Sequence, residues 1–231
     1  MSNQDYHKEL IGKVANALGE LNNEAVYVGG AVVSLYVNDP AAPDVRPTDD
    51  VDVTLEITSV GKLEALRQQL TKKGFRQSPE DDVICRFRYD DIKVDVMATR
   101  QVGWAPANPW FEPGFNHLQK IDIGKTTIRI LSLPYFLASK MSAFRGRAED
   151  PRTSHDLEDI TYILDNKPDL VDKIVGAPED VLNFLTDEFE KMLADSAITE
   201  AIQANLEYGI QAERFAMIEE KLLQIIESQP Q

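Results

Sequence analysis

The fold of this chain is decided by two stretches: Val-Tyr-Val-Gly-Gly at 26–30 and Arg-Pro-Thr-Asp-Asp-Val-Asp-Val at 46–53. The first predicts a short strand that ends at the two glycines and leads directly into a helix. The second begins a run of alternating polar and apolar residues over 50–57, the pattern of a strand with one buried face. Asp50 and Asp52 lie two residues apart, so both should project from the same, polar face.

The rest of the first half also alternates between helical and extended patterns. These patterns predict helices over 5–22, 31–37 and 60–73 and strands over 25–28, 83–89, 92–97, 121–123 and 127–130. In the strand 92–97, Val94 and Val96 take the core face, so Asp95 lies on the opposite face.

From Pro134 onward the pattern is helical to the end, with a helix over 134–148 and further amphipathic helices over about 178–226. We therefore predict an α+β (α/β) fold with two domains, a core over 1–131 and a C-terminal helical domain over 132–231.

Composition narrows the class of protein. The chain has 231 residues, 43% of them apolar, and a formal net charge of −15. It has enough apolar residues for a core, and its acid excess disfavours a protein that coats nucleic acid through phosphate contacts. There is no apolar run long enough for a membrane helix and no signal-peptide pattern at the N-terminus, so we expect a cytoplasmic protein. Cys85 is the only cysteine, which excludes an internal disulfide.

The carboxylates are the main candidates for chemistry, since the phosphate-binding loops GxxxxGK[ST] and GxGxxG and the catalytic motifs HExxH and GxSxG are absent. If the strands of Asp50, Asp52 and Asp95 are close in one sheet, the three side chains converge. Three like charges repel unless a cation is present, and Mg²⁺ or Mn²⁺ suits an all-oxygen cluster. Two such ions can hold the attacking and leaving oxygens of a nucleotidyl transfer. The alternative is that these acids form only the solvated face of an amphipathic strand.

The Gly29-Gly30 pair adds a second element of this pattern. Glycines between a strand and a helix allow a phosphate to approach backbone N–H groups. The alternative is a plain turn that requires a positive φ.

In combination, these motifs resemble the DNA polymerase β-type nucleotidyltransferase superfamily. The resemblance implies that Gly29 and Gly30 contact the triphosphate of an NTP. It also implies that Asp50, Asp52 and Asp95 bind two Mg²⁺ (or Mn²⁺) ions, and that Asp95 helps to activate the acceptor hydroxyl.

Arg46 and Thr48 match an Arg-x-Thr segment that precedes the carboxylates in one branch of this superfamily. Arg46 lies close enough in sequence to pair with an acid or a phosphate of the nucleotide. The alternative is an ordinary loop arginine.

The helix over 134–148 carries Lys140 within an apolar stripe, and Arg147 shares that face. A buried ammonium needs a polar partner, for which a bound phosphate or a site carboxylate would serve. The alternative is a side chain that extends along the helix edge to solvent. Farther along, Thr153 and Asp156 fit a helix capping box, which would explain Asp156 without any catalytic role.

The segment from Leu133 to Arg147, followed by His155-Asp156-Leu-Glu-Asp159, resembles the AbiEii/AbiGii toxin family of nucleotidyltransferases. The resemblance covers about 24–164. It implies that Lys140 and Arg147 contact nucleotide phosphate and that Asp156 is a catalytic or base-positioning residue. His155 departs from the basic residue usual in that family.

The resemblance also implies function and partners. The expected protein transfers a nucleoside monophosphate to an acceptor hydroxyl as the toxin of a toxin–antitoxin pair, with RNA such as tRNA or a protein as acceptor and with a cognate antitoxin. Alternatives are a small-molecule nucleotidyltransferase of the antibiotic-modifying kind and a non-catalytic nucleotide-binding module. A basic patch for RNA would comprise Arg86, Arg88, Lys93, Lys140, Arg145, Arg147 and Arg152. The aromatic loop over 103–118 either packs on itself or stacks on a base.

Overall fold

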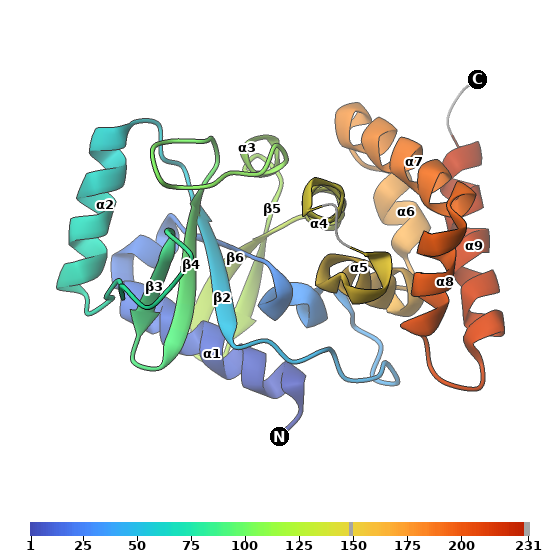
Figure 1. The fold of residues 1–231 in the computed structure, drawn as a ribbon, viewed down its shortest axis with the longest axis horizontal. Coiled ribbons are helices and arrows are strands. Elements are labelled where there is room, and N and C mark those ends of the chain that lie inside the picture. Colours follow the sequence, from blue (N-terminus) through green and yellow to red (C-terminus); the bar gives the residue numbers. More distant parts are fainter. Residues whose placement is uncertain (148–149, 229–231) are drawn as a thin grey trace. The chain divides into compact units, whose positions relative to one another are not determined.

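The computed structural model describes residues 1–147 and 150–228 (Figure 1). The chain divides into two compact units, one formed by Met1–Leu35 with Asp44–Ser132 and the other by Tyr36–Pro43 with the chain from Leu133 onward. The segment Tyr36–Pro43, which lies within the predicted first domain over 1–131, groups with the helical unit. The predicted helix end at 148 and the predicted domain end over 229–231 lie outside the described residues.

The first unit is built on one six-stranded mixed sheet. Its strands are β1 (Val26–Val28), β2 (Asp50–Leu55), β3 (Arg86–Tyr89), β4 (Ile92–Ala98), β5 (Leu118–Ile123) and β6 (Thr126–Leu131). The order across the sheet is β3-β4-β2-β1-β6-β5. The pairs β2–β4 and β1–β6 are parallel and the other neighbours are antiparallel. The strands β2 and β4, far apart in sequence, therefore lie side by side (Figure 1).

The apolar face of this sheet forms the core of the first unit. Val51, Val53, Val94 and Val96 are all buried, as their alternation predicts. Helix α1 (Asn3–Leu18) contacts β2, β5 and β6 and buries Leu10, Ile11, Val14 and Leu18. Helix α2 (Val60–Lys72) buries Leu63, Leu66 and Leu70. The carboxylate-bearing face of β2 and β4 is the opposite one.

Two predicted helices of this unit differ in the structure. The helix predicted over 5–22 ends at Leu18, because Gly19 adopts φ 56° and the chain continues as the 3₁₀ segment η1 (Gly19–Asn23). The helix predicted over 31–37 is instead the 3₁₀ segment η2 (Gly30–Tyr36). Valines and an aromatic residue in such a short segment favour the α-helix only weakly.

The loop over 103–118 packs largely on its own unit. It contains the short helix α3 (Phe111–Gly114), in which Phe111 is buried. Trp104 is half-buried against Phe87, with ring centroids 6.0 Å apart. These contacts favour the self-packed alternative for this loop over a base-stacking one.

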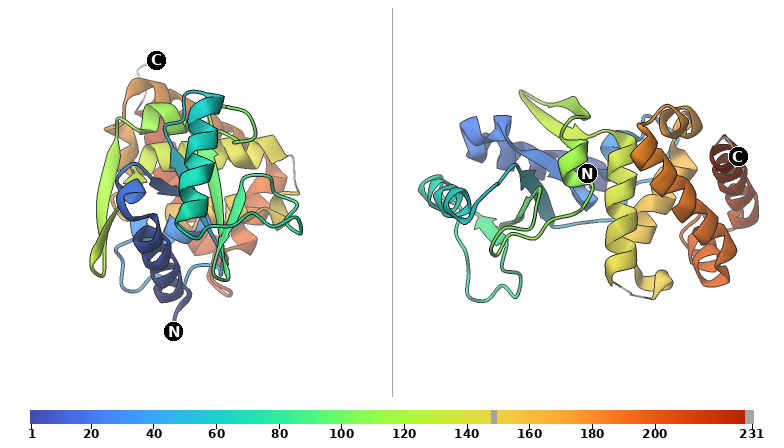
Figure 2. Two further views of the ribbon diagram at one scale, coloured as in Figure 1. Left: turned by 90° about the vertical axis from the view of Figure 1, so that its left-hand side faces the viewer. Right: turned by 90° about the horizontal axis from the view of Figure 1, so that it is seen from above.

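The second unit is helical, with no strand among its described residues (Figure 2). Its helices are α4 (Leu133–Arg147), α5 (His155–Asn166), α6 (Leu170–Val175), α7 (Glu179–Ala194), α8 (Ser196–Ala204) and α9 (Gln211–Glu227). The predicted capping box at Thr153 is wrong. Ser154 caps α5 by accepting from Leu157 N, because Thr153 lies one residue too early and belongs to the preceding 3₁₀ turn.

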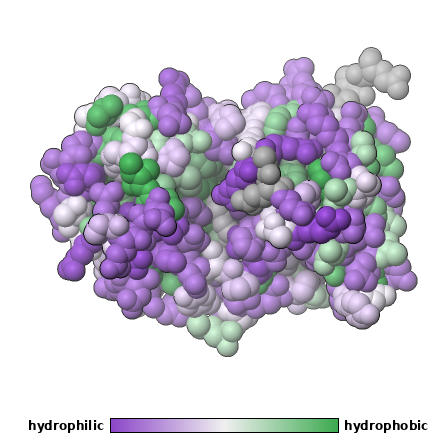
Figure 3. Space-filling view, viewed as in Figure 1, coloured by the Kyte–Doolittle hydropathy of each residue, from purple (hydrophilic) through white to green (hydrophobic). Residues whose placement is uncertain are grey.

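Polar residues cover much of the surface on the face seen in Figure 3. The face drawn in Figure 3 is mainly hydrophilic, with small apolar areas between polar ones. Within residues 1–147 and 150–228, no helix has the length and apolar character needed to span a membrane.

Candidate active site

The carboxylates of β2 and β4 lie on one face of the sheet. Asp52 stands in register beside Asp95 in the parallel pair β2–β4, and Asp50 stands beside Lys93. Register partners on neighbouring strands project from the same face. The structure thus places Asp50, Asp52 and Asp95 on one face of the sheet, with Asp52 directly beside Asp95.

An arginine lies among these carboxylates. Arg86 of β3 is the register partner of Asp95. Its Nε and Nη2 donate to the two carboxylate oxygens of Asp95, each at 2.7 Å, and Nη2 also lies 3.4 Å from Asp50 Oδ2. The Asp95 hydrogen bonds, which are the main cause, raise the pKa of Arg86 even though burial acts in the other direction. The guanidinium therefore stays charged and neutralises part of the acidic cluster.

The loop before β2 holds Asp50 in place. Thr48 Oγ1 donates to Asp50 Oδ1 at 2.5 Å, and the Thr48 backbone N–H donates to Nε2 of the buried His7 at 3.1 Å. Since Nε2 accepts this bond, the proton of a neutral imidazole must be on Nδ1. Helix α1 thereby fixes the segment that carries both Thr48 and Asp50.

The glycine turn after β1 lies against the same carboxylates. Gly29 has φ 74°, and a Cβ built there would overlap the Asp52 carboxylate and lie 2.6 Å from its Cγ. A Cβ built at Gly30 would overlap the guanidinium of Arg46. Gly29 is thus needed for the close approach of Asp52, and at Gly30 the flexible Arg46 side chain would have to move to admit a Cβ.

The donor set fits a hard divalent cation, because three carboxylates share one face of the sheet and Mg²⁺ prefers oxygen ligands. In the arrangement described, however, no three Asp, Glu, His or Cys side chains of residues 1–147 and 150–228 are grouped so as to hold a metal ion. Arg86 binds both oxygens of Asp95 and reaches Asp50 in this arrangement. A cation at this site must therefore share Asp95 with the guanidinium or replace it.

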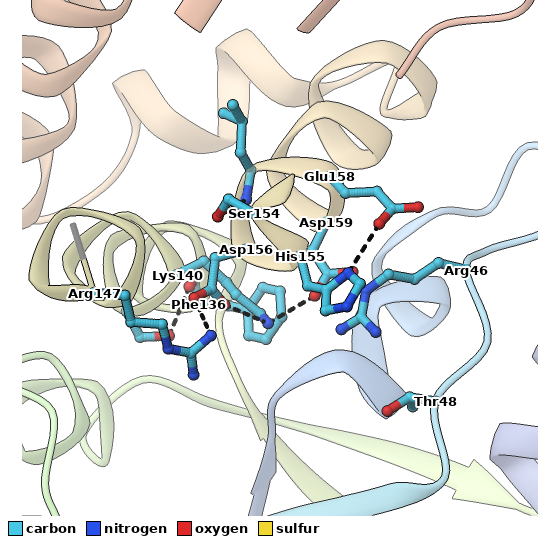
Figure 4. A network of polar contacts seen from close by, with 12 residues as sticks. Arg46, Thr48, Phe136, Lys140, Arg147, Ser154, His155, Asp156, Glu158 and Asp159 are labelled. Atoms are coloured by element: carbon cyan, nitrogen blue, oxygen red, sulfur yellow. Dashed lines mark hydrogen bonds and ion pairs between the residues drawn. The ribbon is translucent and has the colours of Figure 1, made fainter. Parts of the chain in front are cut away.

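The second unit holds a separate charged network between α4 and α5 (Figure 4). Lys140 Nζ donates to Asp156 Oδ1 at 3.0 Å and to Asp159 Oδ2 at 2.7 Å, and Arg147 Nη1 donates to Asp156 Oδ2 at 2.7 Å. Lys140, Asp156 and Asp159 are 7%, 3% and 2% exposed. The lysine in the apolar stripe therefore has two carboxylate partners within its own unit.

The charge of Lys140 is stabilised by these partners. Burial by itself lowers the pKa of a lysine, but the charges of Asp159 and Asp156 and their hydrogen bonds outweigh it, so the pKa of Lys140 is raised. The ammonium and the two carboxylates form a buried ion network, which is costly to break by removing one member.

The arginines of the expected basic patch are mostly paired with acids. Arg88 binds Asp81, Arg145 binds Glu188 and Arg152 binds Glu200. Arg86, Lys140 and Arg147 lie in the networks described above. Lys93 shares the face of the carboxylates and has Arg88 as its register partner on β3.

Sequence reasoning missed the site roles of Arg86 and His7. The alternation of residues in the strand 83–89 could have predicted the position of Arg86. Phe87 takes the core face, so its neighbour Arg86 must lie on the opposite face, which is the face of Asp95. The sequence contains no such signal for His7, because its partner Thr48 is 41 residues away.

The fold and this site define a class of protein. Two solved structures resemble the chain in fold. The first is an antigenic nucleotidyltransferase-like protein from Paracoccidioides brasiliensis, with TM-score 0.52, 18% identity and coverage of 90% of this chain and 96% of that chain. The second is a candidate nucleotidyltransferase from H. pylori, with TM-score 0.50, 12% identity and coverage of 96% of this chain and 94% of that chain. The chain therefore has a nucleotidyltransferase-like fold, as expected.

A family model extends this assignment to function. The model for the nucleotidyl transferase AbiEii toxin, Type IV TA system, matches residues 14–224. The chain belongs to this family and is thus a nucleotidyltransferase toxin of the type IV toxin–antitoxin class, whose members generally use divalent metals. A comparison with curated protein sequences finds no match.

Proposed function

We propose that the protein transfers a nucleoside monophosphate from an NTP to an acceptor hydroxyl, with two Mg²⁺ or Mn²⁺ ions as cofactors. One observation carries this proposal: Asp52 and Asp95 stand in register, with Asp50 on the same face, and a Cβ built at Gly29 would overlap the Asp52 carboxylate. The glycine turn offers backbone N–H groups to a triphosphate, and the three carboxylates offer the oxygen ligands that Mg²⁺ prefers.

Each candidate site residue of the first unit has a role in this proposal. The backbone of Gly29 and Gly30 receives the triphosphate, with Arg46 against Gly30 as its cationic partner. Asp50 and Asp52 hold the cations, and Asp95 completes the ligand set. When bound, the ions supply charge neutralisation of the phosphoryl group and of the attacking oxygen. Thr48 keeps the Asp50 carboxylate in one orientation.

For the second unit we propose roles for Lys140, Arg147 and Asp156. Lys140 and Arg147 contact a phosphate of the nucleotide, and Asp156 positions the acceptor hydroxyl. The support is the fixed geometry of the network, in which Asp156 is oriented by one bond from each cation.

We further propose RNA, such as tRNA, as the acceptor. The support is the local positive charge beside the carboxylates. Lys93 stands in register with Asp50, and Arg88 stands in register with Lys93. These cations therefore flank the carboxylates on the same face of an otherwise acidic protein, where they could contact RNA phosphates. As a toxin of the type IV class, the protein is expected to be neutralised by a cognate antitoxin.

The proposal is tested with α-labelled NTPs incubated with the protein, Mg²⁺, and either total RNA or a protein extract. We expect label in the RNA fraction with the wild type and a loss of at least about 100-fold in Asp50→Asn and Asp52→Asn, since each removes a metal ligand. Asp49→Asn is the matched control, because Asp49 is exposed and precedes the strand.

Label in protein or in a small molecule would contradict the RNA acceptor and leave nucleotidyl transfer standing. Equal labelling by wild type and Asp52→Asn would contradict the proposed active site itself. Growth arrest on expression of the wild type, absent with Asp50→Asn, tests the toxin activity in cells.

A further inference from the structure

Arg86 contacts two carboxylates of the proposed metal site, those of Asp95 and Asp50. Its contacts are not those of a surface ion pair. The Arg86 side chain is 16% exposed and the Asp95 side chain 12% exposed, and the two form a two-bond fork with both distances at 2.7 Å. Such bidentate arginine–carboxylate pairs have a specific geometry and are stronger than hydrogen bonds between neutral groups.

The two carboxylates that Arg86 contacts are those a divalent cation would use. Asp95 offers both oxygens to Arg86, and Asp50 Oδ2 lies 3.4 Å from the same Nη2 nitrogen. Three carboxylates on one face repel one another in the absence of a positive charge. Arg86 supplies that charge from within the chain.

We propose that Arg86 is a built-in counter-ion that competes with the divalent cation for Asp95 and Asp50 and thereby sets the cation affinity of the site. This inference rests on the proposed function, since it concerns the same carboxylates. Arg86 is a positioning residue in this account, because it acts through the carboxylates of Asp95 and Asp50.

The chain provides a matched control on the same strand. Arg88, two residues along β3 and on the same face, makes an equivalent fork to Asp81 at 2.8 and 2.6 Å. Asp81 is not one of the proposed metal ligands, so removing Arg88 removes the same charge and the same type of pair without freeing a site carboxylate.

The test is Mn²⁺ binding to the full-length protein, followed through the EPR signal of free Mn²⁺ without nucleotide. We expect Arg86→Gln to bind Mn²⁺ at least about fivefold more tightly than the wild type, because a competing positive charge is removed. Arg86→Lys should lie between the two, since it keeps the charge but loses the fork. Arg88→Gln should match the wild type, and Arg86→Gln/Asp52→Asn should lose the tight binding.

Equal or weaker Mn²⁺ binding by Arg86→Gln, with binding still dependent on Asp52, would overturn the role of Arg86 and leave the metal site standing. Absence of Asp52-dependent binding in every variant would overturn both. Since Arg86→Gln leaves Asp95 without its partner and can fail to fold, a second measurement uses the wild type. The Arg86 side-chain Nε–H resonance, assigned with Arg86→Lys, should shift on addition of Mg²⁺, and an unchanged resonance at saturating Mg²⁺ would overturn the proposal.

Discussion

The Thr48 hydroxyl donates a 2.5 Å hydrogen bond to Asp50 Oδ1, two residues farther along the chain. Thr48 is thus the residue that orients one carboxylate of the proposed metal site. A hydrogen bond to a charged group contributes about 1.5–3 kcal/mol.

We expect Thr48→Val to lower kcat/KM for nucleotidyl transfer by about ten- to a hundredfold, since this loss corresponds to one charge-assisted hydrogen bond. Thr48→Ser keeps the hydroxyl and should remain within about threefold of the wild type. Steady-state kinetics with labelled NTP measure both. Equal activity of Thr48→Val and the wild type would show that the bond has no part in catalysis.

His7 should act on the same segment through stability. In His7→Leu the Thr48 backbone N–H loses its acceptor, so we expect the free energy of unfolding to fall by about 1–3 kcal/mol. Urea denaturation followed by circular dichroism measures it. His7→Gln, which supplies another acceptor, should recover part of the loss, and no recovery would indicate that packing alone explains the effect.

Gly29 should tolerate no side chain. Gly29→Ala is disfavoured by φ 74° and by overlap of its Cβ with the Asp52 carboxylate, so we expect nucleotidyl transfer to fall by at least about 100-fold. Gly124→Ala is the matched control: its φ is 61°, but a Cβ there has nothing within 4 Å. This control should lose about 1 kcal/mol of stability from backbone strain and keep its activity. Similar behaviour of the two variants would mean that strain alone, and not the approach of Asp52, matters at Gly29.

The buried network of the second unit should be sensitive to loss of its lysine. Lys140→Met leaves Asp156 and Asp159 buried without their shared ammonium, so we expect a loss of about 3–5 kcal/mol in stability. Arg147→Met removes a side chain that is 55% exposed and should cost at most about 1 kcal/mol. Chemical denaturation distinguishes them, and equal losses would contradict a buried network centred on Lys140.

The pH dependence of the Lys140 contribution follows from the direction of its shift. Because the folded pKa is raised above 10.5, the stabilisation is complete below that pH and is lost as pH rises through the folded pKa. The difference in stability between wild type and Lys140→Met should therefore stay constant from pH 7 to 9.

Cys85 should be unreactive in the native protein. Burial, reinforced by the negative charge of Asp95, raises the pKa of its thiol from 9.0 to about 11. At pH 8 this reduces the thiolate fraction about 100-fold, so alkylation by iodoacetamide should be slower than in the denatured chain by at least that factor. Rapid labelling of the native protein, followed by mass spectrometry, would contradict this burial.

The sequence by itself determined which residues share a strand face. Alternation with a period of two requires Asp50 and Asp52 to oppose Val51 and Val53, and it places Asp95 opposite Val94 and Val96, whatever the strands pair with. The motifs at Gly29-Gly30 and around Lys140 were equally readable, since a glycine turn and a lysine in an apolar stripe are local patterns. The class of fold followed from these local signals.

Only the tertiary structure decided what stands beside these residues. The pairing of β2 with β4 puts Asp52 next to Asp95, and the pairing of β3 with β4 adds Arg86 to them. Helix packing in the second unit gives Lys140 two carboxylate partners from α5. Strand order, register and helix packing depend on contacts between residues far apart in the chain, and local periodicity contains no information about which distant segments will meet.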